Sequence, residues 1–252
     1  MPDGSHDKRL SIRHPATVSA GSVVSMLLAE ELALVAIRPG SGRHELGAGD
    51  QLNACLAGLL VAELLLEEFV GPGDRDDRIV AVPGRPAPQS PTLAAALLVV
   101  AEKGPRMKAV LSHMSRGLQE HLGMSTWDAA VSALTAEGIL GPSTGGLLPR
   151  RPLLDAAARD VIVDRLRAAA GGEGPIEPRT ALVLSMTGPG QLLEVVAPER
   201  STRKHARDRI DHALDGSDLA PVGKVVRRLI EEAAAVASTA AIAGGVAATG
   251  SS

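Results

Sequence analysis

The fold is decided by the stretch QLNACLAGLLVAELLLEEFV, residues 51–70. Apolar residues fill nearly every position of this stretch until the acidic pair Glu67 and Glu68, and it contains no proline. A helix that is apolar on all faces is typical of the centre of a helical bundle. Asp50, just before it, belongs to the residue types that cap a helix N-terminus. We therefore predict a buried central helix with Asp50 as its N-terminal cap.

Helical patterns continue on both sides of this stretch. Residues 22–37, SVVSMLLAEELALVAI, predict a second buried helix that begins near a serine and becomes extended before Pro39. Pro91 fits the first turn of a helix, and Ser125 with Asp128 fits the capping pair of another that stops at Gly138. Further helical patterns cover residues 156–170, two pieces around 188–190, the segment from 200 and residues 221–236.

Two segments between the helices have other patterns. Residues 78–84, RIVAVPG, read as a short strand. Gly-Pro and Gly-Gly turn signals between residues 139 and 155 predict a β-hairpin. The chain is thus expected to be mainly α, a single globular domain of about eight helices with a small β-hairpin over residues 22–237. Residues 1–21 read as a disordered lead-in and residues 238–252 as a flexible tail of small residues.

Composition excludes several classes of protein. Only Phe69 and Trp127 are aromatic among 252 residues, and 26 basic against 29 acidic residues give a net charge of −3. Nucleic acid is not an expected partner, because a basic field and stacking aromatics are both lacking. The single Cys55 rules out an internal disulfide and lies in an apolar run, so we expect a buried thiol.

The two ends of the chain bear on location. The N-terminal stretch lacks the apolar core of a signal peptide. Residues 233–250 carry no charge but consist mainly of Ala and Gly, which insert poorly into membranes compared with Leu or Ile. We expect a cytoplasmic protein, and its richness in Ala, Gly, Arg and Pro favours a GC-rich bacterial source.

Catalytic and metal motifs give weak signals. GPSTG, residues 141–145, matches the letters of a nucleophile elbow, but Pro142 and Gly146 indicate a turn around Ser143. His113, Glu120 and His121 are the nearest set of metal ligands, yet adjacent residues on a helix point about 100° apart. We predict no enzyme, no metal site and no cofactor.

Basic residues suggest where an anion could bind. The segment from Arg200 to Arg209 spreads its charges around a helix and reads as a solvated surface. Arg150 and Arg151 instead follow Leu147 and Leu148 in the expected hairpin, which places cations beside an apolar tip. A membrane-touching loop needs this combination. The alternative is an ordinary hairpin packed on its own domain.

Five blocks in order resemble the Golgi phosphoprotein 3 family: LLAEELALVAI, LAGLLVAELLLEE, LTAEGIL, RPLLDAAARDVIVDRLRAAA and EPRTALVLSM. The resemblance implies a mainly α-helical single domain. Its eukaryotic members bind phosphatidylinositol 4-phosphate on Golgi membranes and hold glycosyltransferase tails.

The resemblance also identifies the positions of the family's headgroup pocket, which one tryptophan and three arginines form. An ungapped match places Ala48, Ala57, Met124 and Trp127 there. The three arginine positions thus lack the guanidinium fork that suits phosphate, and the tryptophan position holds alanine.

Two hypotheses follow. The first is a peripheral module that binds an anionic phospholipid or membrane surface on the cytoplasmic side. Its candidate binding residues are Arg43, Arg116, Trp127, Arg150 and Arg151, and Leu147 and Leu148 would contact the membrane. The second is a cytosolic scaffold of the same fold that binds a protein partner and no lipid.

Overall fold

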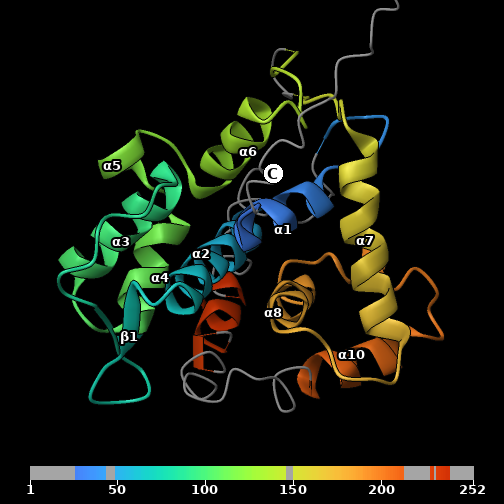
Figure 1. Ribbon diagram of the computed structural model, residues 1–252. Coiled ribbons are helices and arrows are strands. Elements are labelled where there is room, and N and C mark those ends of the chain that lie inside the picture. The colour runs from blue at the N-terminus through green and yellow to red at the C-terminus, as the bar shows by residue number, and fades with distance from the viewer. Residues whose placement is uncertain (1–25, 44–48, 146–149, 213–227, 230, 239–252) are drawn as a thin grey trace, which may run out of the picture.

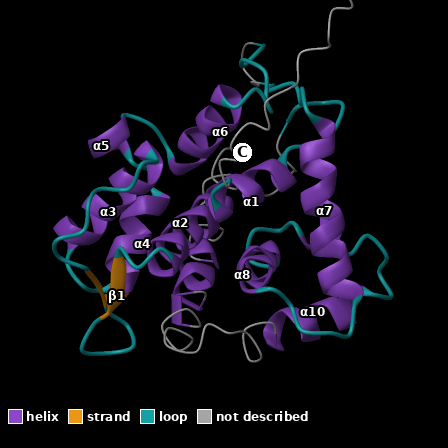
Figure 2. Ribbon diagram, viewed as in Figure 1, coloured by secondary structure: helices purple, strands orange, loops and turns teal. Residues whose placement is uncertain are grey.

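The computed structural model describes residues 26–43, 49–145, 150–212, 228–229 and 231–238 (Figure 1). These residues are mostly helical with one small antiparallel sheet, as the sequence predicts (Figure 2). Residues 228–229 and 231–238 are also helical. The helices and strands, in chain order, are α1 (Leu28–Ala36), α2 (Gly49–Leu66), β1 (Val70–Pro72), β2 (Ile79–Ala81), α3 (Pro91–Lys103), α4 (Met107–Ser115), α5 (Gln119–Leu122), α6 (Thr126–Ala136), α7 (Ala156–Gly171), α8 (Pro178–Thr187), α9 (Leu193–Val196) and α10 (Arg203–His212).

The central helix is α2, as predicted. It packs against α1, α3, α4, α6 and α8, and Leu56, Leu59 and Leu60 are fully buried. The helix begins at Gly49, so Asp50 lies in its first turn and the prediction that Asp50 caps the helix is wrong. Cys55 is fully buried, as expected, and burial raises the pKa of its thiol to about 12. The thiol is therefore a packing group at neutral pH.

The other helices lie on two sides of α2. On one side, α3 packs on α4 and on β2. On the other, α7 packs on α8, α9 and α10. Helix α1 connects the two sides, because it contacts α2, α6, α7 and α8 (Figure 1).

Helix α1 is shorter than the predicted residues 22–37. Leu27 is extended, with φ −66° and ψ 149°, so the helix starts at Leu28; residues 22–25 lie outside the described part. Ile37 is extended, which confirms the expected end of the helix. All nine residues of α1 are buried. So short a helix is marginal alone in water, and its surroundings must hold it.

Several helix boundaries follow the local signals. The Ser90 hydroxyl accepts the Leu93 N–H at 3.4 Å before Pro91, and Ser125 accepts the Asp128 N–H at 3.0 Å. Gly138, with φ +76°, follows the end of α6 as predicted. Gly117, with φ +122°, divides the segment of His113 and His121 into α4 and α5.

The β structure is small. The expected strand within residues 78–84 is β2, which pairs antiparallel with β1 in the register Val70 to Ala81. The expected hairpin between residues 139 and 155 is present as two isolated antiparallel bridges, Leu140 with Leu153 and Thr144 with Arg150. Its tip, with Leu147 and Leu148, lies outside the described residues, as do residues 1–21 and 239–252. None of the described helices is long and apolar enough to cross a membrane.

Candidate functional site

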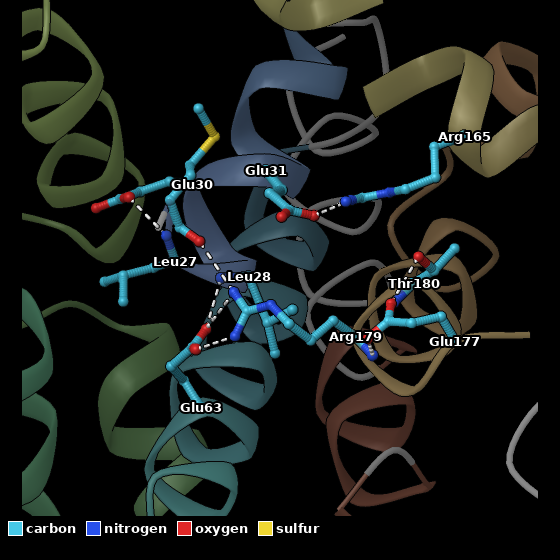
Figure 3. A network of polar contacts seen from close by, with 10 residues as sticks. Leu27, Leu28, Glu30, Glu31, Glu63, Arg165, Glu177, Arg179 and Thr180 are labelled. Atoms are coloured by element: carbon cyan, nitrogen blue, oxygen red, sulfur yellow. Dashed lines mark hydrogen bonds and ion pairs between the residues drawn. The ribbon is translucent and has the colours of Figure 1, made fainter. Parts of the chain in front are cut away.

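Three buried glutamates lie around the N-terminal end of α1 (Figure 3). Glu30, Glu31 and Glu63 are 5%, 6% and 2% exposed. Glu30 Oε2 accepts the Leu27 N–H at 2.8 Å, and Glu63 Oε2 accepts the Leu28 N–H at 2.7 Å. The first N–H groups of a helix have no partner within the helix. The two carboxylates therefore cap an apolar helix that has no serine or aspartate to do so.

Two of the three glutamates have an arginine partner. Arg165 of α7 binds Glu31, and Arg179 of α8 binds Glu63 (Figure 3). Arg179 Nη2 also donates to the Met26 carbonyl at 2.9 Å. The Arg165 side chain is half-exposed, but it is also the ion partner of a buried carboxylate.

The pKa values of Glu30 and Glu31 differ because Glu31 has an arginine partner and Glu30 has none among the described residues. Burial raises the pKa of Glu31, and Arg165 opposes the rise. Burial raises the pKa of Glu30 to about 7, and the nearby charges of Glu137, Glu63 and Glu31 add to the effect. Glu30 is therefore about half-ionised at neutral pH.

The C-terminal end of α1 is held by an arginine. Arg159 of α7 is 5% exposed and donates from Nε to the Ile37 carbonyl at 2.8 Å and from Nη2 to the Val35 carbonyl at 3.2 Å. Glu63 and Arg159, which lie far from α1 in the sequence, thus each satisfy backbone groups at one end of this helix. The roles of Glu63, Arg159 and Arg179 were not predicted from the sequence. One feature of the sequence could have indicated this site: Glu63 is the one charged residue between Leu52 and Leu66, in the helix predicted to be buried.

The predicted binding residues lie around the N-terminal end of α6. We call Arg43, Arg116, Trp127, Arg150 and Arg151 the α6-end cluster. The backbone N–H of Arg151 donates to the Gly42 carbonyl at 2.8 Å, which places the loop of Arg43 beside the hairpin. Arg151 Nη2 lies 3.9 Å from Asp128 Oδ1 in the first turn of α6. Arg150 is exposed and pairs with Thr144 across the hairpin.

The other two members reach the same helix end from α4 and α6. Arg116 is exposed and follows α4. In the next turn, the Leu118 N–H donates to the carbonyl of Met124, two residues before α6 begins, at 3.0 Å. Trp127 is half-buried in the first turn of α6, and its backbone N–H donates to Asn53 Oδ1 on α2 at 3.0 Å. The structure thus brings residues that are up to 108 positions apart in sequence to one helix end.

The positions matched to the headgroup pocket do not form a phosphate cradle. Ala57 is fully buried in α2, while Met124 and Trp127 are half-buried at the start of α6. Ala48 lies outside the described residues. Met124 and Trp127 lie at the same end of α6 as the arginines of the α6-end cluster, but those arginines come from neighbouring segments of the chain.

The acidic and histidine residues of α5 lie closer together than the helical angle suggests. Ligand atoms of Glu102, Glu120 and His121 lie within 4.8 Å of one another, contrary to the argument that Glu120 and His121 would diverge. Lys103 Nζ, however, donates to Glu120 Oε2 at 3.2 Å. A side-chain cation thus already neutralises that carboxylate.

Two weaker sequence signals have plain structural explanations. Ser143 lies in an exposed arm of the hairpin and not at a strand-to-helix turn. In the basic segment that continues into α10, Arg203 binds Glu194 at 2.8 Å, and Arg209 donates to the Ala169 and Gly174 carbonyls at 3.0 and 2.9 Å. These arginines hold neighbouring segments in place.

The family model described as Golgi phosphoprotein 3 (GPP34) matches residues 28–233, which span the chain from the start of α1 to the helical segment after α10. A search of curated proteins finds no match.

Proposed function

We propose that this chain, which belongs to the Golgi phosphoprotein 3 family, is a peripheral membrane-binding module without catalytic activity. In this proposal the α6-end cluster contacts anionic lipid headgroups. The observation that carries the proposal is the convergence of four arginines and the one tryptophan on one end of α6, from the 38–43 loop, the end of α4, α6 itself and the hairpin.

Charge supplies most of the expected attraction. A basic residue near an anionic membrane surface contributes about 1 kcal/mol. Arg43, Arg116 and Arg150 are exposed, whereas Arg151 is half-buried and near Asp128. The three exposed arginines are expected to contribute most, and Arg151 less, because Asp128 already offsets part of its charge.

An exposed apolar side chain lies on the same hairpin arm as Arg150 and Arg151. Leu154, at the end of the returning hairpin arm, is 63% exposed. With the tip residues Leu147 and Leu148, it would give the hairpin an apolar contact beside Arg150 and Arg151. Basic residues combined with exposed apolar ones favour binding at the interface of a membrane.

The same arrangement argues for low headgroup specificity. Bidentate recognition of a phosphate needs arginine forks fixed in place. Ala57, Met124 and Trp127 occupy the matched positions, and the cluster arginines lie on loops and at a helix end. We therefore propose a general preference for anionic lipids, with no preference for phosphatidylinositol 4-phosphate beyond its charge.

Vesicle sedimentation tests the proposal. The full chain is mixed with phosphatidylcholine vesicles, with vesicles containing phosphatidylserine, and with vesicles of equal charge containing phosphatidylinositol 4-phosphate. We expect equal binding to both anionic types at low salt, loss of that binding at high salt, and little binding to the neutral vesicles. Equal sedimentation with neutral and anionic vesicles at low salt would overturn the proposal and favour the scaffold hypothesis.

A further inference from the structure

A pocket of about 420 Å³ lies at the N-terminal end of α1, between α1, the start of α3 and α6. Its walls are mainly apolar and include Leu27, Pro91, Leu122, Met124 and Ala133. Sites for small molecules typically have volumes of about 300–1,000 Å³ and apolar walls with a few polar groups. No member of the α6-end cluster lines this pocket, so it is independent of the proposed membrane contact.

The charged residues that line the pocket are both acidic. They are Glu30, from the first turn of α1, and Glu137, from the end of α6. The part of α3 that faces the pocket contributes Ser90, Pro91 and Thr92, which carry no charge. An apolar pocket with only negative charge complements an apolar ligand with a positive group.

Glu30 differs from its two acidic neighbours in its partners. Glu31 binds Arg165 and Glu63 binds Arg179, and Figure 3 shows the Glu30 carboxylate on the side of α1 away from Arg165. Within the described part of the chain, Glu30 forms no ion pair, and Leu27 N–H is its hydrogen-bond donor. The other charged groups near it are the carboxylates of Glu31, Glu63 and Glu137. A buried carboxylate without a cation is destabilising, and a bound cation would relieve that cost.

We infer that this pocket binds a small apolar amine, whose ammonium group pairs with Glu30 and whose hydrocarbon part lies against Leu122, Met124 and Ala133. The ammonium supplies to Glu30 the partner that Arg165 and Arg179 supply to the neighbouring glutamates. An alcohol of the same length keeps the apolar contact but not the charge. A carboxylate of the same length meets two like charges in the pocket and is excluded.

The binding has a defined pH dependence. Because the pKa of Glu30 is about 7, roughly a tenth of its side chains are ionised at pH 6 and roughly nine tenths at pH 8. An alkylamine stays protonated over this range, as the lysine side chain does. The affinity for the amine is therefore expected to rise about tenfold from pH 6 to pH 8, while the affinity for the alcohol stays nearly constant.

Isothermal titration calorimetry on the full chain with octylamine, octanol and octanoate tests the inference. At pH 8 we expect octylamine to bind at least tenfold more tightly than octanol, and octanoate not to bind. Equal affinity for the amine and the alcohol, or no binding of millimolar octylamine, would overturn it. This ranking uses the unaltered protein and does not depend on a variant that must fold.

Variants then locate the site. Glu30→Gln keeps an acceptor for the Leu27 N–H and should reduce octylamine affinity at least tenfold, to the level of octanol. Ala133→Phe fills the pocket and should abolish binding of both compounds. Glu173→Gln removes an exposed carboxylate that does not line the pocket and should leave binding unchanged. Full octylamine binding by both Glu30→Gln and Ala133→Phe would place the amine outside this pocket and refute the assignment.

Discussion

Arg179 of α8 and Glu63 of α2, 116 positions apart in the chain, form a charge pair in which the Glu63 side chain is only 2% exposed. Arg179 also binds the Met26 carbonyl, and Glu63 caps Leu28 (Figure 3). The pair thus joins the central helix, α8 and the start of α1. A buried carboxylate is tolerated here because both its charge and its lone pairs have partners.

Removing Arg179 should destabilise the protein strongly. Arg179→Ala leaves the Glu63 carboxylate buried without its cation, and breaking such a pair costs about 3–5 kcal/mol. The free energy of unfolding, measured by urea titration with circular dichroism, should fall by that amount. Arg75→Ala is the control, because Arg75 and Asp77 form an exposed pair at 3.5 Å and should contribute less than about 1 kcal/mol.

A double variant refines this prediction. Replacing both partners, as Glu63→Met with Arg179→Met, removes the unpaired charge and should be less destabilising than the sum of the single changes. If the single changes simply add, the two side chains do not act as a pair. Such additivity would contradict the assigned role of Arg179.

Glu30 should make stability depend on pH. Its pKa is raised from 4.5 to about 7 in the folded state, so the folded protein binds more protons than the unfolded chain between these values. Stability from this group is therefore greatest below pH 4.5, falls as pH rises towards 7 and is constant above it. The full difference is about 3 kcal/mol.

Comparison with Glu30→Gln isolates this effect from the other carboxylates. Urea titrations of both proteins at pH 5 and pH 8 should show that the variant gains stability relative to the original chain as pH rises. The difference in unfolding free energy should change by about 2–3 kcal/mol between these two values. A constant difference would mean that Glu30 titrates near its ordinary pKa.

Arg159 should be sensitive to a conservative change. Its guanidinium binds two carbonyls at the end of α1, Val35 and Ile37, from two different nitrogens. Lysine keeps the charge but lacks the fork, so Arg159→Lys should leave a carbonyl unsatisfied and cost about 1–3 kcal/mol in unfolding free energy. Arg207→Lys, at an exposed position in α10, is the matched control and should change stability by less than about 0.5 kcal/mol. Equal stability of the two variants would refute the capping role.

Local signals in the sequence predict much of this fold. Continuous apolar residues identify α2. Pro91, Ser125 with Asp128, and Gly138 mark helix ends because each acts within one turn of its own helix. The start of α1 was misplaced for the opposite reason. Its capping groups include Glu63, which lies 35 positions away.

The candidate sites were predictable in part. The residues of the α6-end cluster were identified from charge and from family resemblance, but their common location depends on how three loops pack around α6. The pocket beside Glu30 could not be predicted, since its walls come from α1, α3 and α6. Glu30 and Glu31 are adjacent in sequence, and only in the folded chain does Glu31 gain Arg165 while Glu30 faces the pocket.

The most direct test of the membrane-binding proposal compares two quadruple variants on vesicles containing phosphatidylserine. One carries Arg43→Ala, Arg116→Ala, Arg150→Ala and Arg151→Ala; the control carries Arg75→Ala, Lys108→Ala, Arg167→Ala and Lys204→Ala, which changes the net charge equally at other exposed positions. At about 1 kcal/mol per arginine, the first should lose at least about 100-fold in vesicle affinity, and the control should lose only a few-fold. Equal losses in both variants, or undiminished binding by the first, would contradict the proposal that the α6-end cluster is the membrane-binding surface.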